Sequence, residues 1–133
     1  MNDKNLIKNS RVIILQKLYS HQLNKDTQLI FPKHRYKKFI KDVVLGTIER
    51  KDLILDLMNK ELNEDINENK TELIVKLIIM SAIYEFMFMH KTPIKVIISE
   101  YLKVSEYFVK NSQKKYLNAI LDKISKKSRI KNQ

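Results

Sequence analysis

Residues 73–89 read LIVKLIIMSAIYEFMFM, and this segment decides the fold. It is apolar on most helical faces and carries only two charged residues, Lys76 and Glu85. A membrane-spanning helix needs about 20 mostly apolar residues, and this segment is shorter. A helix that is apolar all round is buried inside a protein. We therefore expect residues 73–89 to form the central helix of a helical domain.

The composition favours an all-α fold in one compact domain of 133 residues. One glycine and two prolines are too few for a turn-rich β protein, or for the glycine loops that approach phosphate groups in nucleotide-binding folds. The absence of cysteine excludes disulfides, thiolate zinc sites and cysteine nucleophiles, and it permits a reducing compartment. Residues 1–6 are polar and no apolar signal core follows them, so we expect a cytoplasmic protein.

The chain is strongly basic, with a formal net charge of +11 from 26 Lys and Arg against 15 Asp and Glu. Basic residues dominate the two ends, whereas residues 51–70 hold three basic and six acidic residues. Such asymmetry favours a polyanionic partner, either a nucleic acid or an anionic membrane surface. The alternative is a lysine-rich surface that serves only solubility.

Helical periodicity of three and four residues recurs along the chain and predicts six to seven helices. We expect the first helix to end near Asn24 and the second to begin at Pro32. Gly46, inside the second helix, predicts a close helix crossing or a break. The expected helices are 4–23, from 32 onward, 53–62, 71–89 capped by Thr71, 93–108 and a last helix capped by Asn111 and Ser112. We divide the domain into an N-terminal part (1–62), a loop (63–70), a C-terminal part (71–127) and a frayed tail (128–133).

Two groups of basic residues are candidate phosphate contacts. Lys4, Lys8 and Arg11 follow the i, i+4, i+7 spacing of one helical stripe. Lys114 and Lys115 fall in the expected first turn of the last helix, where backbone N–H groups favour anions. The alternative for Lys4, Lys8 and Arg11 is ordinary charge that serves solubility.

Nothing in the chain indicates catalysis. The three histidines, His21, His34 and His90, show no metal-ligand spacing, and there is no nucleophile motif. We expect no enzyme activity, no metal and no cofactor.

Five segments in order resemble the signatures of the NusB transcription antitermination family over nearly the whole chain. Tyr84–Glu85 falls in one of them, which resembles the family's Ala-x-Tyr-Glu-Leu. The five segments are QKLYSHQL (16–23), FIKDVVLG (39–46), AIYEF (82–86), PIKVIISE (93–100) and KYLNAILD (115–122).

The resemblance implies two small helical bundles packed together and a function in transcription. Members of this family bind boxA, a short single-stranded element of nascent ribosomal RNA, as a heterodimer with the ribosomal protein NusE. The complex joins other Nus factors on RNA polymerase and suppresses premature termination, which also couples transcription to ribosome assembly. Both monomers and homodimers occur in the family, so the resemblance leaves the oligomeric state open.

The resemblance also suggests roles for single residues. Lys4, Lys8 and Arg11 lie where the family has an arginine-rich, RNA-binding helix. Tyr116 corresponds to a phenylalanine beside the RNA, with a core tyrosine as the alternative.

Three further residues are candidate partner contacts. Tyr19 corresponds to a tyrosine near the RNA and NusE, although its spacing also suits the core. Glu85 would face NusE, or alternatively lie in a buried pair, since an isolated buried carboxylate is costly. Tyr84 joins it as a partner candidate or as core, and we expect Asn118 to be a buried hydrogen-bonding residue.

The chain departs from the family pattern at Met80, Ser99 and Ala119, which replace arginine, asparagine and glycine. Lysine also replaces arginine in the first helix, and lysine cannot make bidentate phosphate contacts, so we expect weaker and more salt-sensitive RNA binding.

Two other functions remain open at this point. One is a helical scaffold for a ribosomal protein with little specific RNA recognition. The other is a peripheral membrane protein, although no Trp or Phe stripe accompanies the N-terminal lysines.

Overall fold

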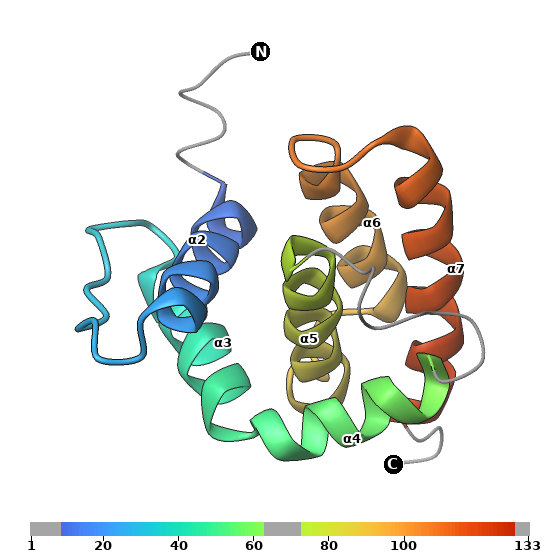
Figure 1. The fold of residues 1–133 in the computed structure, drawn as a ribbon, viewed down its shortest axis with the longest axis horizontal. Coiled ribbons are helices and arrows are strands. Elements are labelled where there is room, and N and C mark those ends of the chain that lie inside the picture. The colour runs from blue at the N-terminus through green and yellow to red at the C-terminus, as the bar shows by residue number, and fades with distance from the viewer. Residues whose placement is uncertain (1–8, 63–72, 130–133) are drawn as a thin grey trace.

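The computed structural model describes residues 9–62 and 73–129, and within these ranges the chain forms six α-helices and no strands (Figure 1). This confirms the all-α prediction. The helices are α2 (Ser10–Leu23), α3 (Lys37–Glu49), α4 (Lys51–Leu62), α5 (Leu73–Phe88), α6 (Ile94–Ser105) and α7 (Asn111–Ser128).

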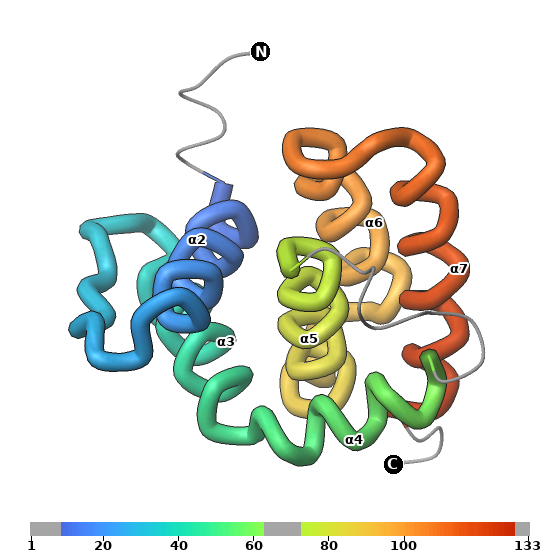
Figure 2. Tube along the Cα trace, in the orientation of Figure 1, coloured from blue at the N-terminus to red at the C-terminus, as the bar shows by residue number. Residues whose placement is uncertain are grey.

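Helix α5 lies at the centre and packs against each of the other five helices, as its apolar sequence predicts. Helices α2 and α3 lie on one side of it and α6 and α7 on the other, and α4 crosses below α5 from α3 to α7 (Figures 1 and 2). The core therefore joins residues from both halves of the chain in one apolar cluster. The predicted division into two parts stays a prediction, because the segment between them, with the expected loop 63–70 and the cap Thr71, lies outside the described residues.

Helix α2 begins later than the sequence suggested. Asn9 has extended backbone, and its side-chain Oδ1 accepts hydrogen bonds from the backbone N–H groups of Arg11 (2.9 Å) and Val12 (3.1 Å). This N-cap starts the helix at Ser10, so the predicted single helix running through Lys4 to Arg11 is wrong. At the other end Asn24 is the C-terminal cap, as predicted, and its N–H bonds the carbonyl of Ser20.

Helix α3 also begins later than predicted, at Lys37 rather than at Pro32. A turn at His34 precedes it: the His34 carbonyl accepts a hydrogen bond from the N–H of Lys37, and the His34 ring nitrogen Nδ1 accepts one from the N–H of Tyr36. Proline is compatible with a helical first turn but does not require one, and here these local bonds set the start.

Gly46 permits a close helix crossing, as predicted. A Cβ atom at this position would overlap the ring of Tyr84, which packs against α3 from α5. Helix α3 continues past Gly46 to Glu49, and Arg50 alone separates it from α4.

The C-terminal end departs from the sequence prediction in two ways. Helix α7 begins at Asn111, so Asn111 is its first residue and Lys110 takes the cap position. The helix continues to Ser128, and the guanidinium of Arg129 is fixed against the end of α5, so the tail is not frayed at 128–129. Arg129 donates hydrogen bonds to the carbonyls of Phe86 (2.9 Å), Thr92 (2.9 Å), Glu85 (3.2 Å) and Met89 (3.2 Å).

Candidate nucleic-acid and protein-binding surfaces

Arg11 and Glu85 form a buried ion pair between α2 and α5. The Arg11 Nη2 lies 2.7 Å from Glu85 Oε1 and Nε lies 3.1 Å from Oε2, which is the bidentate geometry that arginine favours with carboxylates. The Tyr101 hydroxyl, from α6, donates a hydrogen bond to the same carboxylate. The Glu85 side chain has no exposed surface, and that of Arg11 is 12% exposed. One carboxylate thus links three helices.

Aromatic rings complete this cluster. The Arg11 guanidinium lies 5.0 Å from the ring centroid of Phe39 and 5.4 Å from that of Tyr101, both within cation–π range. Burial alone would lower the pKa of Arg11, but the hydrogen bonds and charge of Glu85, together with Tyr101, raise it overall. Burial, and then the negative charge of Glu85, raise the pKa of Tyr101 well above its usual value. The cluster therefore keeps Arg11 charged and Tyr101 neutral.

This arrangement bears on two predicted site residues. It corresponds to the paired-network alternative for Glu85 and leaves the carboxylate no surface for a protein partner. It also turns Arg11 inward, although the sequence grouped Arg11 with Lys4 and Lys8 as a phosphate contact. Lys4 and Lys8 lie outside the described residues.

Tyr84 is half-buried and packs between helices. Its ring covers Gly46 and lies 5.1 Å from the ring of Phe88, over which the Arg50 guanidinium is placed at 4.4 Å. Burial raises the pKa of the Tyr84 hydroxyl. The position agrees with the core alternative more than with a partner contact.

Tyr19 lines an apolar groove at the surface. The side chain is 41% exposed, and the groove, about 320 Å³ in volume, is completed by Leu15, Gln16, Ile74 and Phe108. Phe108, which the sequence analysis did not select, is 36% exposed and lies in the turn after α6. The available signal was the pair of adjacent aromatic residues, Tyr107 and Phe108, at the end of the helix expected over 93–108. Two aromatic side chains nearly 90 positions apart thus share one groove.

The candidate residues at the start of α7 differ in exposure. Lys115 is exposed, whereas Lys114 forms an ion pair with Glu106. Tyr116 is partly buried against the apolar core, in agreement with its core alternative. Lys114 is the fourth residue of α7 and its N–H bonds the Lys110 carbonyl, so the two lysines follow the free N–H groups of the first turn instead of occupying it.

Asn118 is exposed, and the prediction that it is a buried hydrogen-bonding residue is wrong. It lies on the accessible side of α7 that lines a groove beside α6, because positions 117, 120 and 121 take the buried face. The three positions that depart from the family pattern, Met80, Ser99 and Ala119, all lie within helices, and only Met80 is buried.

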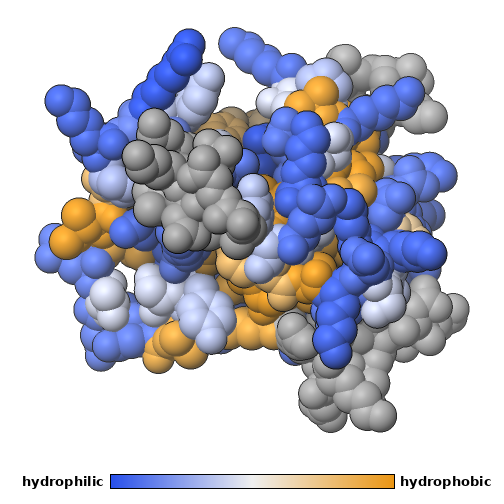
Figure 3. Space-filling model, turned by 90° about the horizontal axis from the view of Figure 1, so that it is seen from above, coloured by the Kyte–Doolittle hydropathy of each residue, from blue (hydrophilic) through white to orange (hydrophobic). Residues whose placement is uncertain are grey.

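Seen from the end of the bundle, hydrophilic side chains extend from the surface around visible apolar patches (Figure 3). Within the described ranges no cluster of three or more His, Asp or Glu residues has metal-binding geometry. In the same part of the chain, no helix has both the length and the hydropathy needed to cross a membrane.

Comparison with known proteins identifies the family. The model of the NusB family matches residues 8–126, and the chain belongs to this family. The structure of NusB from T. maritima superimposes with a TM-score of 0.80 over 93% of both chains at 24% identity, which shows the shared fold.

Named relatives are similar at the level of sequence. The transcription antitermination protein NusB of Thermodesulfovibrio yellowstonii is 26% identical over 88% of this chain and 89% of its own length. The protein of the same name from Bartonella henselae is 25% identical over 66% of this chain. The chain spans 56% of the Bartonella relative and 59% of the Mesorhizobium japonicum relative, little more than half of each.

Proposed function

We propose that this protein is a non-catalytic transcription antitermination factor that binds boxA-type single-stranded RNA together with the ribosomal protein NusE. In this role it joins the RNA polymerase elongation complex through other Nus factors and supports transcription of ribosomal RNA. Membership of the NusB family supports the proposal, as does the net charge of +11, which attracts RNA.

The observation that carries the RNA part of the proposal is the groove that contains Tyr19 and Phe108. Single-stranded RNA is recognised largely by stacking of splayed bases on aromatic side chains, which contributes about 1–3 kcal/mol per base. The two exposed rings line one apolar groove of about 320 Å³ and supply such a surface. Lys115, together with Lys4 and Lys8, supplies the phosphate contacts in this proposal, and Tyr116 follows Lys115 along the chain.

The buried cluster changes how the RNA site is tested. Substitution of Arg11 would leave the Glu85 carboxylate unpaired inside the protein, so a loss of RNA binding would then report unfolding. The double variant Lys4→Gln/Lys8→Gln tests the N-terminal phosphate contacts without disturbing the ion pair.

The decisive experiment measures fluorescence anisotropy of a labelled boxA RNA and of a scrambled RNA, with and without NusE, at two salt concentrations. We expect preference for boxA, tighter binding with NusE and weaker binding at high salt. Phe108→Ala should weaken boxA binding about tenfold, as loss of one stacked base predicts. Tyr36→Ala removes another exposed aromatic ring, which lies outside the groove, and should leave binding unchanged.

The second candidate function is a scaffold for a ribosomal protein with little RNA specificity, and the inward position of Arg11 favours it by removing one phosphate contact. Equal weak binding to both RNAs, with NusE still bound by the protein, would select the scaffold and overturn the RNA proposal. If NusE binding is also absent, both proposals fail.

A further inference from the structure

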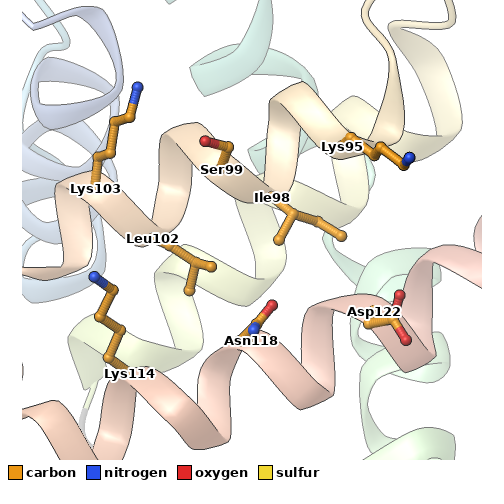
Figure 4. Close-up of a pocket in the computed structure, with 8 residues that line it drawn as sticks. All are labelled: Lys95, Ile98, Ser99, Leu102, Lys103, Lys114, Asn118 and Asp122. Atoms are coloured by element: carbon orange, nitrogen blue, oxygen red, sulfur yellow. The ribbon is translucent and has the colours of Figure 1, made fainter.

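Helices α6 and α7 present facing side chains along an open groove of about 440 Å³ (Figure 4). On α6 the lining positions 95, 98, 99 and 102 follow the i, i+3, i+4, i+7 spacing of one helical face. On α7 positions 114, 118 and 122 form the opposing face, and an adjoining hollow of about 380 Å³ extends this face to positions 111 and 115. The groove shares no lining residue with the one that contains Tyr19 and Phe108.

The middle of the groove is apolar and its ends are charged. Ile98 and Leu102 point from α6 toward α7, and Asn118 points back toward them (Figure 4). Both aliphatic side chains are only partly buried, so they offer apolar surface to a bound chain. Asn118 carries an amide that can both donate and accept a hydrogen bond between them.

Lysines stand at both ends of the groove. Lys95 on α6 and Asp122 on α7 stand at one end, and Lys103 on α6 and Lys114 on α7 stand at the other (Figure 4). The Lys103 side chain is 68% exposed, and its ammonium forms an ion pair with the Glu100 carboxylate at 4.0 Å. These lysines are therefore accessible to a negatively charged ligand.

The chemistry of the lining selects between two anionic ligands. Single-stranded RNA needs aromatic or arginine planes for its bases, and the residues that line the groove include neither. Asp122 and the Glu106 carboxylate paired with Lys114 would also repel a continuous phosphate backbone. An amphipathic peptide can place its separated carboxylates beside the separated lysines of the groove. Its apolar side chains then lie on the apolar middle of the groove.

We propose that the groove between α6 and α7 binds a short acidic, amphipathic segment of a partner protein. Aliphatic side chains of the segment pack on Ile98 and Leu102, and its carboxylates pair with Lys95 and Lys103. This site goes beyond the proposed function, because it takes an acidic protein segment in a groove that shares no lining residue with the one containing Tyr19 and Phe108. Lys115, a phosphate contact in the proposed function, lines only the adjoining hollow.

The test uses the full chain and a fluorescein-labelled helical peptide with leucines at i and i+4 flanked by glutamates. A control peptide carries glutamine in place of each glutamate. We expect the acidic peptide to bind and the glutamine peptide to bind at least about tenfold more weakly, with the difference shrinking at high salt. Equal binding of the two peptides, or binding of neither, would overturn the proposal.

Variants locate the site. Lys95→Glu/Lys103→Glu should weaken binding about tenfold, whereas the matched reversal Lys38→Glu/Lys41→Glu on exposed positions of α3 should have no effect. Asn118→Trp fills the groove without changing its charge and should also abolish binding. This variant is a second test in case the lysine-to-glutamate substitutions weaken binding by disturbing the fold. Displacement of the peptide by a boxA RNA, together with loss of RNA affinity in Lys95→Glu/Lys103→Glu, would assign the groove to RNA instead. If the groove that contains Tyr19 and Phe108 does not bind RNA, the proposed function fails, but the peptide experiment still tests the α6–α7 groove.

Discussion

Two carboxylate–cation pairs in this protein have similar chemistry and opposite surroundings. Glu85 and Arg11 pair inside the bundle with exposed fractions of 0% and 12%, whereas Glu106 and Lys114 pair on the surface with 56% and 34%. The interior pair also receives the Tyr101 hydroxyl and two aromatic faces. The surface pair is exposed to solvent, and Lys103 stands at the same end of the α6–α7 groove.

The comparison teaches that burial, and not charge, separates the residues that hold the fold together from those that stay accessible at the surface. A buried pair is costly to break, because the remaining charge stays without water or a partner, while a surface pair contributes little to stability. The interior cluster therefore fixes α2, α5 and α6 relative to one another. The lysines around the surface pair remain available to a ligand.

The largest expected effect comes from breaking the interior pair. Glu85→Ala should lower the free energy of unfolding by about 3–5 kcal/mol, because it leaves the Arg11 guanidinium buried and unpaired. Urea denaturation measures this change. Replacing both partners, in Arg11→Met/Glu85→Leu, should recover most of the loss. A cost for Glu85→Ala below about 1 kcal/mol would show that the interior pair behaves like a surface pair.

Arg129 sharpens the comparison because it is charged, partly exposed and bonded to backbone carbonyls rather than to a carboxylate. Arg129→Ala should cost about 1–3 kcal/mol, since it removes hydrogen bonds from a charged donor to the carbonyls at the end of α5. Thermal denaturation compares it with Lys127→Ala, a change at an exposed position of the same helix turn. Equal melting temperatures of the two variants would mean that the hydrogen bonds of Arg129 do not stabilise the fold.

Alkaline pH should weaken the interior cluster through the Tyr101 hydroxyl. The fold raises the pKa of Tyr101 above its unfolded value of about 10, so the neutral phenol stabilises the protein fully below that pH. This contribution is lost as pH rises toward the raised pKa of the folded state. Unfolding free energies at pH 8 and pH 10.5 should therefore fall more in the wild type than in Tyr101→Phe. Equal decreases in the unfolding free energy of the two proteins would show that other titrating groups cause the effect.

The smallest effect is expected at the surface pair. Glu106→Gln should change the free energy of unfolding by less than about 1 kcal/mol, and the change should shrink further at high salt. A loss as large as that of Glu85→Ala would contradict the distinction between the two pairs. The same variant frees Lys114 at the end of the α6–α7 groove, so it should leave binding of the acidic peptide intact or strengthen it.

The sequence alone determined the helical class, the buried central helix, the basic surface and the family resemblance. These properties depend on composition and on the local spacing of apolar residues, both of which can be read along the chain. The sequence predicted the helix starts poorly. Pro32 suggested a start for the second helix, but the hydrogen bonds of His34 place it later. The periodicity suggested one first helix from Lys4 onward, but the Asn9 side chain caps a helix that begins at Ser10. The anchoring of Arg129 was also missed, because its carbonyl partners lie 37–44 positions away.

Only the tertiary structure decided which charges are buried within the fold and which are exposed at its surface. Arg11 and Glu85 are 74 positions apart, and nothing local shows that they meet. The same holds for Tyr19 and Phe108 in one groove, and for the opposing faces of α6 and α7. Periodicity gives the face of a helix on which a residue lies, but the partner of that face depends on how the helices pack.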